Sequence, residues 1–416
     1  AGIDWASRQL AAIDPTQTDA VVDFSTGADP EADENLRYLR NKGGAFGGIY
    51  ASQMREMGLV KLDDPDLPVP FCKDAALPLA GGFLDALGSL ANDFLATVED
   101  GKVSLSKLDR LALIKPSRIQ AGSPEQRHLG SVLMARHETA TSSDHARYQT
   151  LLLLLQLSRQ LRRPPKSEET KWVWFGASAA REIGLCASDL RPVWALYQTS
   201  DLFRLGYETL LYAGLRILND APRSRLPLPG VVAELMNLAD LPSNVRLEDW
   251  MLEQADGDSF EDRARTATLA MQEAHSSGDS QQEVRSALTL IATLTLKARQ
   301  FDRSVLQWLG TAGHFQSLVS EAEFLKAWQD LSAAEAISGL LRDRILKRHL
   351  WVASRKFRNQ KAYTFLFEPD EGALRYRSSF RVSPSNPRID QAVQFLRDVK
   401  FLDDGGITPL GLKELE

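Results

Sequence analysis

Cysteine is almost absent from this chain of 416 residues, which contains only Cys72 and Cys186. Two cysteines so far apart in sequence provide neither a disulfide framework nor the thiolate set of a cysteine-based zinc site. Scarce cysteine also suits a reducing compartment, so we expect a cytoplasmic protein.

The chain also lacks a long hydrophobic run. Its longest apolar stretch, "TLLLLLQLSRQL" at 150–161, is much shorter than the roughly 20 apolar residues that span a bilayer. The first residues, "AGIDWASRQLAAID", lack the basic and then apolar order of a secretory signal. We therefore expect no membrane partner.

An overall positive charge is missing as well, because 49 Lys and Arg stand against 55 Asp and Glu, giving a formal net charge of −6. The molecule as a whole does not attract nucleic acid, and any such contact must come from a local patch. A hydrophobic content of 44% and a charged content of 25% are typical of globular proteins. The length predicts two or three domains.

Sequence motifs for nucleotide binding or hydrolysis are not found. The stretch "NKGGAFGGIY" at 41–50 fits neither glycine-rich phosphate-binding fingerprint, and a helix end with a hinge explains it better. Glu368, Asp370 and Glu371 resemble a nuclease carboxylate set, but turn chemistry accounts for them. No nucleophile elbow is present, so we predict no catalytic residues and no cofactor.

One histidine-rich segment raises the possibility of a metal site. His128, His137 and His145 lie near Glu138 and Asp144. Their spacings of nine and eight residues do not place two ligands one turn apart on a helix face, and no cysteine joins them. We predict no bound metal.

Helical periodicity dominates the chain. Apolar residues recur at spacings of three and four in 147–163, 201–220, 283–300 and 322–358, which is typical of amphipathic or buried helices. Stretches rich in Pro, Gly, Ser and Asp separate them, at 162–170, 219–230, 238–244, 254–262 and 274–282. The fold class is predicted to be mainly α, with several domains.

A β-hairpin is predicted near the C-terminus, in "KAYTFLFEPDEGALRYRSSFRV" at 361–382. A strand over 363–367, the turn "PDEG" and a second strand form this pattern. The second strand alternates apolar and polar residues from Leu374 to Val382. Arg375 and Arg377 are therefore expected on one side, and Leu374 and Tyr376 on the other.

The last residues predict two further helices. Asn386 and Pro387 are expected to start the first, and Thr408 and Pro409 the second. The first would bury a stripe formed by Ile389, Val393, Leu396 and Val399. The acidic balance of this segment makes it a scaffold behind the hairpin rather than a nucleic-acid-reading element.

A similar order of residues occurs near the N-terminus. "QMREMGLVKLDD" at 53–64 matches "QFLRDVKFLDDG" at 394–405 in layout. An apolar helix that ends in a short strand, a turn and a new helix start resembles winged-helix modules. The resemblance covers at most 36–90 and 341–416. It implies three domains: an N-terminal winged-helix-like module (1–115), a helical body (116–340) and a basic C-terminal winged-helix-like module with the hairpin (341–416).

The basic charge of the chain is concentrated between Arg342 and Arg381, where eleven cations face only Asp343, Glu368, Asp370 and Glu371. Aromatic residues lie among these cations, a combination that is typical of nucleic-acid binding. A solvated basic face or a dock for an acidic partner is an equally good interpretation. The predicted contact residues are Arg348, Arg355, Lys356, Arg358, Lys361, Arg375, Arg377 and Arg381.

Tryptophan and tyrosine gather in the central stretch 171–215. At helical spacing such residues more often fill a core than a binding site. Arg191, Gln198, Asp201 and Glu208 offer the alternative of a polar groove.

Most of the chain resembles the uncharacterised helical accessory proteins encoded in bacterial anti-phage defence loci. "YASQMREMGLV", "PVWALYQTSDLFRLGYETLLYAGL" and "TFLFEPDEGALRYR" followed by "NPRIDQAVQFLRDVKFL" carry this resemblance. It implies a role beside separate catalytic subunits. We expect a non-catalytic adaptor that binds partner proteins and contacts DNA or RNA through its C-terminal basic patch. The alternative is a nucleic-acid-processing enzyme with its site in the helical body.

Overall fold

The computed structural model describes residues 2–14, 16, 20–25, 31, 46, 50–62, 71–136, 140–176, 190–257, 259–309 and 317–416. Within these ranges the protein is mainly α-helical, as the periodicity predicts, with four small antiparallel sheets. No helix there is both long and apolar enough to cross a bilayer.

The chain forms two compact units. Unit 1 consists of Ala1–Ser167, Ile183–Ser188 and Arg388–Glu416, and unit 2 of Glu168–Glu182 and Asp189–Pro387. This division differs from the three predicted ranges, because the last 29 residues fold with the N-terminal part of the chain while the hairpin folds with the helical body.

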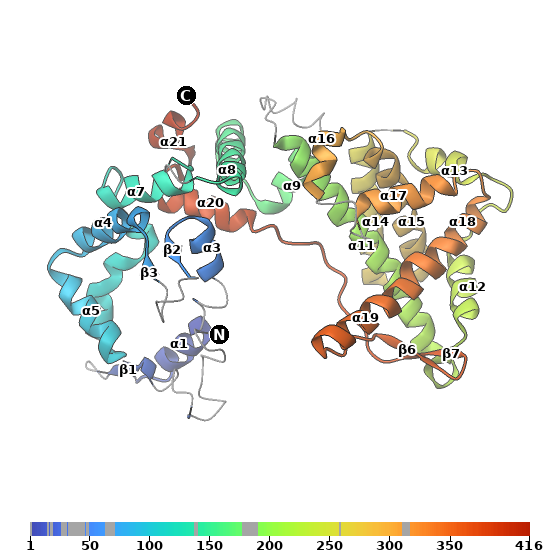
Figure 1. Ribbon diagram of the computed structural model, residues 1–416, viewed down its shortest axis with the longest axis horizontal. Helices are drawn as coiled ribbons and strands as arrows, with labels where there is room; N and C mark the ends of the chain where they lie inside the picture. The colour runs from blue at the N-terminus through green and yellow to red at the C-terminus, as the bar shows by residue number, and fades with distance from the viewer. Residues whose placement is uncertain are drawn as a thin grey trace. The chain divides into compact units, whose positions relative to one another are not determined.

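The elements of unit 2 are mostly helices (Figure 1). They are α9 (Ser167–Phe175, beginning one residue before the unit), α11 (Arg191–Asp220), η6 (Pro222–Ser224), β5 (Arg225–Leu226), α12 (Leu228–Ala239), α13 (Leu247–Gln254), α14 (Phe260–Ser277), α15 (Ser280–Ala298), α16 (Arg303–Leu306), η7 (Gln307–Leu309), α17 (Leu318–Ala327), α18 (Ala333–Gly339), η8 (Leu340–Leu346), α19 (Lys347–Gln360), β6 (Phe367–Asp370) and β7 (Ala373–Tyr376).

The core of unit 2 surrounds α15, whose Leu290 and Leu294 are fully buried. The long helix α11 packs directly against it. Gly206 makes the close approach possible, because a Cβ at that position would lie 3.0 Å from Cγ1 of Ile291. Leu210, Leu215 and neighbouring apolar residues of α11 recur at helical spacing, so they face this core together.

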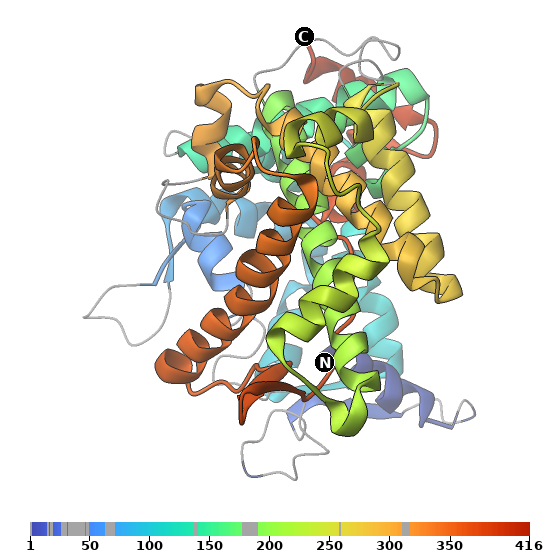
Figure 2. The ribbon, with the colours of Figure 1, turned by 90° about the vertical axis from the view of Figure 1, so that its right-hand side faces the viewer.

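One continuous helix links the core of unit 2 to the hairpin. A capping box between Ser332 and Glu335 starts α18, which passes into the π-helical turn η8 and then into α19. In Figure 2 this orange helix runs down toward the hairpin. The π-helical turn places Arg344 between α18 and α19, and such turns often occur at functional sites.

The predicted hairpin is confirmed, but its first strand lies later in the chain than expected and its second strand ends earlier, at Tyr376. Phe367 pairs with Tyr376 and Asp370 with Ala373. The turn is shorter than "PDEG", because Glu371 and Gly372 both have positive φ angles, of 49° and 81°, the conformation of a two-residue turn. Strand β5 adds a third strand beside β7; its two residues are too few for a periodic signal.

Unit 1 is also mostly helical. Its helices are α1 (Gly2–Ala11), α3 (Ala51–Glu56), η2 (Asp74–Ala76), α4 (Leu77–Leu87), η3 (Gly88–Leu90), α5 (Ala91–Asp100), α6 (Leu105–Arg110), η4 (Leu111–Ile114), η5 (Pro116–Arg118), α7 (Pro124–Leu133), α8 (Ser142–Leu161), α20 (Ile389–Asp398) and α21 (Pro409–Lys413). Three strand pairs accompany them: β1 (Val21–Asp23) with β4 (Lys102–Ser104), β2 (Val60–Lys61) with β3 (Phe71–Cys72), and β8 (Leu402–Asp403) with β9 (Gly406–Ile407).

The two similar sequence stretches of unit 1 fold in the same way. After α3, the amide of Leu59 donates to the carbonyl of Met54; after α20, the amide of Phe401 donates to the carbonyl of Leu396. The residue before each donor, Gly58 or Lys400, has a positive φ. A two-residue strand then pairs with a return strand in both places. Much of the preceding range 36–50, including most of "NKGGAFGGIY", lies outside the described residues.

The C-terminal helices are partly as predicted. The stripe from Ile389 to Val399 is buried, and the hydroxyl of Thr408 caps α21 by accepting from the amide of Gly411. The start of α20 at Asn386 and Pro387 was wrong: the helix begins at Ile389, because Arg388 takes a left-handed conformation with φ 59°.

This terminal segment belongs to unit 1, whereas the hairpin belongs to unit 2. It packs within unit 1, where Nε2 of Gln126 donates to the carbonyl of Val399 at 3.0 Å. Nζ of Lys400 donates to the carbonyl of Ser117 at 2.9 Å. These contacts join the segment to α7 and η5. The spacing of residues in the sequence does not predict that α20 packs against them.

Candidate nucleic-acid interface

The second half of α19 presents the most basic surface of the region singled out from sequence. No acidic residue occurs from Arg344 to Phe367. Lys356, Arg358 and Lys361 are exposed, and they form no ion pair with any residue that the structure describes. Together with Arg355 we call these residues the α19 basic face.

Aromatic side chains stand exposed beside these cations. Trp351 is 45%, Phe357 47% and Tyr363 56% exposed. The guanidinium of Arg355 lies 5.2 Å from the ring centroid of Trp351. The rings of Phe357 and Tyr363 meet edge to face at 6.2 Å. Large aromatic rings left in water among cations are the combination that binds unpaired bases and phosphates.

Buried contacts hold α19 to the body. A guanidinium nitrogen of Arg348 lies 2.5 Å from the carboxylate of Glu321 on α17, and the hydroxyl of Tyr207 on α11 donates to the same carboxylate at 2.8 Å. Burial and the neighbouring Glu321 raise the pKa of Tyr207 well above its usual value, so the phenol keeps its proton. The side chain of Arg348 is only 9% exposed. It is engaged inside unit 2, whereas the other cations predicted to bind nucleic acid are exposed.

His349 provides a second anchor. Its Nε2 accepts a hydrogen bond from the amide of Leu366 at 3.0 Å, and its ring packs against Phe367 at 5.0 Å between centroids. Burial, with a smaller contribution from the charge of Lys356, lowers the pKa of His349 from 6.5 to about 4. The imidazole is therefore neutral near pH 7, which suits its acceptor role.

The hairpin cations differ from those of α19, because acidic neighbours pair with them. Arg377 forms an ion pair with Glu368, and Arg375 lies 3.9 Å from Asp370. The bonds from Arg377 and Tyr363 lower the pKa of Glu368. Arg375 and Arg377 are exposed, whereas Leu374 is buried. Arg381 lies beyond β7 and is exposed.

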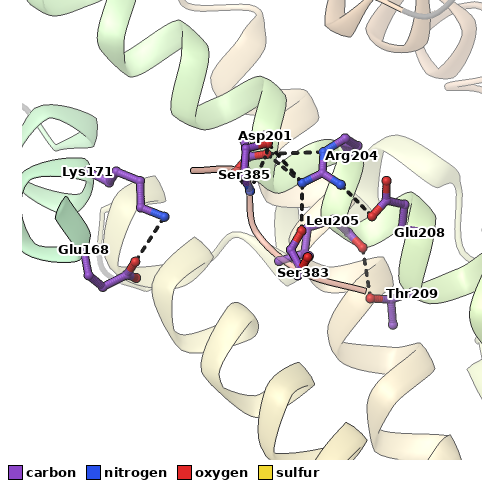
Figure 3. A network of polar contacts seen from close by, with 9 residues as sticks. All are labelled: Glu168, Lys171, Asp201, Arg204, Leu205, Glu208, Thr209, Ser383 and Ser385. Carbon is purple, nitrogen blue, oxygen red and sulfur yellow. Dashed lines mark hydrogen bonds and ion pairs between the residues drawn. The ribbon is translucent and has the colours of Figure 1, made fainter. Parts of the chain in front are cut away.

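Asp201 and Glu208, two of the four polar residues that offered the alternative of a groove, are engaged in contacts within unit 2 (Figure 3). The carboxylate of Asp201 accepts from the amide of Ser385 at 3.1 Å. Arg204, which sequence reasoning missed, binds Asp201 at 2.8 Å, Glu208 at 2.5 Å and the carbonyl of Ser383 at 3.0 Å. Its spacing of three and four residues from these acids on one helix is the signal that could have revealed the pairing. The network fastens 383–385 to α11.

The aromatic residues of the central stretch pack inside unit 2, as the core interpretation predicts. The rings of Trp174 and Trp194 lie 4.9 Å apart, and Trp174 is only 2% exposed. Gln198 is also buried, at 3% exposure. Aromatic residues of this stretch therefore fill the interior of unit 2.

No metal-binding group forms around the histidines that the structure describes. Asp144 accepts from the amide and hydroxyl of Thr141 at the start of α8. Burial opposes its ionisation, but bonds from Thr141 and Arg147 outweigh that effect and lower the pKa of Asp144. His137 and Glu138 lie outside the described residues. Among the residues described, no three His, Cys, Asp or Glu side chains come together.

Comparison with known proteins gives no relative: no protein-family model, curated protein or solved structure matches this chain.

Proposed function

We propose that this protein is a non-catalytic adaptor that contacts single-stranded nucleic acid through the α19 basic face. The observation that carries the proposal is the set of unpaired, exposed cations Lys356, Arg358 and Lys361 beside exposed aromatic rings. In a chain of net charge −6, such a patch attracts phosphate locally although the molecule as a whole does not.

Exposed aromatic rings favour a single strand over a duplex. Bases in a duplex are already stacked and paired, whereas unpaired bases can stack on Trp351, Phe357 or Tyr363. Stacking contributes about 1–3 kcal/mol per base and is tolerant of sequence. The proposed interaction is therefore sequence-tolerant and weakened by salt.

The adaptor role is argued from the arrangement of helices and strands in unit 1. The repeated order of helix, strand pair and helix in unit 1 supports the resemblance to winged-helix modules. We extend the proposal to a subunit of a larger complex, in which partner proteins supply catalysis; an anti-phage defence system stays a prediction from sequence. We do not propose the enzymatic alternative, because Asp201 and Glu208 have internal partners.

Fluorescence anisotropy with labelled 20-nucleotide dT and rU strands and a 20-base-pair duplex tests the proposal. The variant Lys356→Gln/Arg358→Gln/Lys361→Gln should bind both single strands much more weakly than the unaltered protein. Phe357→Ala/Tyr363→Ala should weaken single-strand binding at constant charge, since it removes stacking surfaces.

Matched controls separate these effects from total charge and exposed aromatic area. Arg223→Gln/Arg303→Gln/Lys326→Gln removes three exposed cations of unit 2 that lie off α19, and Trp308→Ala removes a ring that is 57% exposed. Both controls should bind like the unaltered protein. Equal weakening in the control and in the α19 variant would refute a specific site.

A further inference from the structure

A cleft of about 570 Å³ lies within unit 2, on the side of α19 next to the core. Its volume is within the range of roughly 300 to 1,000 Å³ that small-molecule sites occupy. The apolar part of its lining comes from α11, η7, α17, η8 and α19: Phe203, Leu211, Leu309, Leu318, Ile345 and Val352.

Two cationic side chains of this cleft already have partners. Arg204 binds the carboxylates of Asp201 and Glu208. Arg348 binds Glu321 at 2.5 Å. Because each guanidinium is matched by at least one carboxylate, neither contributes a free charge to the cleft.

Arg344 is different. Its nearest carboxylate is Glu321 at 3.8 Å, the oxygen that Arg348 already approaches much more closely. Its guanidinium lies 4.4 Å from the ring of Phe324 and makes no hydrogen bond to any described residue. The side chain is only 27% exposed. The N–H donors of Arg344 therefore remain available to an acceptor that enters the cleft.

A second unused polar group lines the same cleft. The hydroxyl of Ser200 on α11 is buried and has no hydrogen-bond partner within the described part of the chain. Buried hydroxyls normally have a partner. Arg344 and Ser200 thus leave donors unsatisfied in a cleft whose remaining surface is largely apolar.

We propose that this cleft binds a small organic monoanion, with its apolar body against the leucines and Phe203 and its oxyanion at Arg344. A carboxylate or sulfonate presents two oxygens to the guanidinium fork of Arg344, the cleft arginine whose nearest carboxylate lies 3.8 Å away. A dianion fits less well, because the carboxylates of Glu208 and Glu321 also line the cleft, and an inorganic ion leaves the apolar side chains of the cleft without a partner. The site is independent of the α19 basic face.

Fluorescence titration with 8-anilinonaphthalene-1-sulfonate, an aromatic monoanion, tests the site, with uncharged N-phenyl-1-naphthylamine as the matched probe. Arg344→Gln should weaken sulfonate binding at least about tenfold, the loss expected for one charge-assisted contact, and leave the uncharged probe unaffected. A near-UV circular dichroism spectrum like that of the unaltered protein shows that the variant is folded. Val352→Trp, which fills the cleft, should abolish binding of both probes.

Two results would overturn the proposal. One is unchanged sulfonate affinity in Arg344→Gln. The other is loss of sulfonate binding in Lys356→Gln/Arg358→Gln/Lys361→Gln, which would assign the probe to surface cations instead. 1-Naphthoate should displace the sulfonate probe and inorganic phosphate at the same concentration should not; displacement by phosphate would contradict the need for an apolar body.

Discussion

Replacing Glu321 with leucine should destabilise unit 2 by about 3 to 5 kcal/mol, the usual cost of leaving one member of a buried ion pair without its partner. The carboxylate side chain is 4% exposed and that of Arg348 is 9% exposed. Their separation is 2.5 Å. The replacement also removes the acceptor of the Tyr207 hydroxyl, which adds to the loss.

Urea unfolding followed by tryptophan fluorescence measures this effect. Seven of the eight tryptophans lie in unit 2, and only Trp5 lies in unit 1, so the signal reports mainly on unit 2. Arg348→Met should cost a similar amount. The double variant Glu321→Leu/Arg348→Met should cost clearly less than the sum of the two single changes, because both members of the close buried pair are then removed together. Arg344 and Tyr207 lose Glu321 equally in the single and the double variant.

The matched control is an exposed pair. Arg246 and Asp249 lie 2.8 Å apart, with side chains 57% and 50% exposed. Asp249→Ala should leave the urea midpoint of unit 2 nearly unchanged, because water screens an exposed pair. A Glu321→Leu cost below about 1 kcal/mol, or full additivity in the double variant, would refute the reasoning.

Three further predictions concern packing and pH. Phe367→Ala should destabilise unit 2 by about 3 to 5 kcal/mol in urea unfolding, since the ring is fully buried; a cost below about 1 kcal/mol would contradict this burial. Lowering the pH from 6.5 to 4 should remove up to about 3 kcal/mol of stability through His349. Its folded pKa is depressed to about 4, so the unfolded state binds the proton first. The stability of His349→Gln should fall less over that range, and an identical pH profile in the two proteins would exclude this role. Gly82→Ala should cost about 1 to 3 kcal/mol, because the new Cβ would lie 2.9 Å from the backbone nitrogen of Glu125; thermal unfolding with no shift would show that α4 and α7 can separate freely.

The sequence predicts the helices of this fold well, because their apolar spacing is strong and Pro or Gly marks many of their ends. It predicts the existence of the hairpin but not its register, which depends on the positive φ angles of Glu371 and Gly372. Strand β5 carries too little pattern to be recognised. The packing of α20 on α7 depends on contacts such as that between Gln126 and Val399, which lie 273 residues apart in sequence.

The sequence likewise predicts some features of the candidate site and not others. Charge counting finds the basic region, and the exposed aromatic rings within it follow from the residue order. Charge counting cannot show that Arg348 forms an ion pair with Glu321, which lies 27 residues earlier on another helix. The pairing of Arg377 with Glu368 was within reach of sequence reasoning, because the two strands of a hairpin bring such residues together. Only the three-dimensional structure shows that the N–H donors of Arg344 have no acceptor among the described residues.

The salt dependence of single-strand binding is the most direct test of the central claim. Each cation that neutralises a phosphate on a single strand contributes about 0.7 to the slope of log affinity against log salt. Removing Lys356, Arg358 and Lys361 together should therefore reduce the slope for labelled dT by about 2, while the control variant off α19 keeps the slope of the unaltered protein. An equal slope in all three proteins would contradict nucleic-acid binding at the α19 basic face.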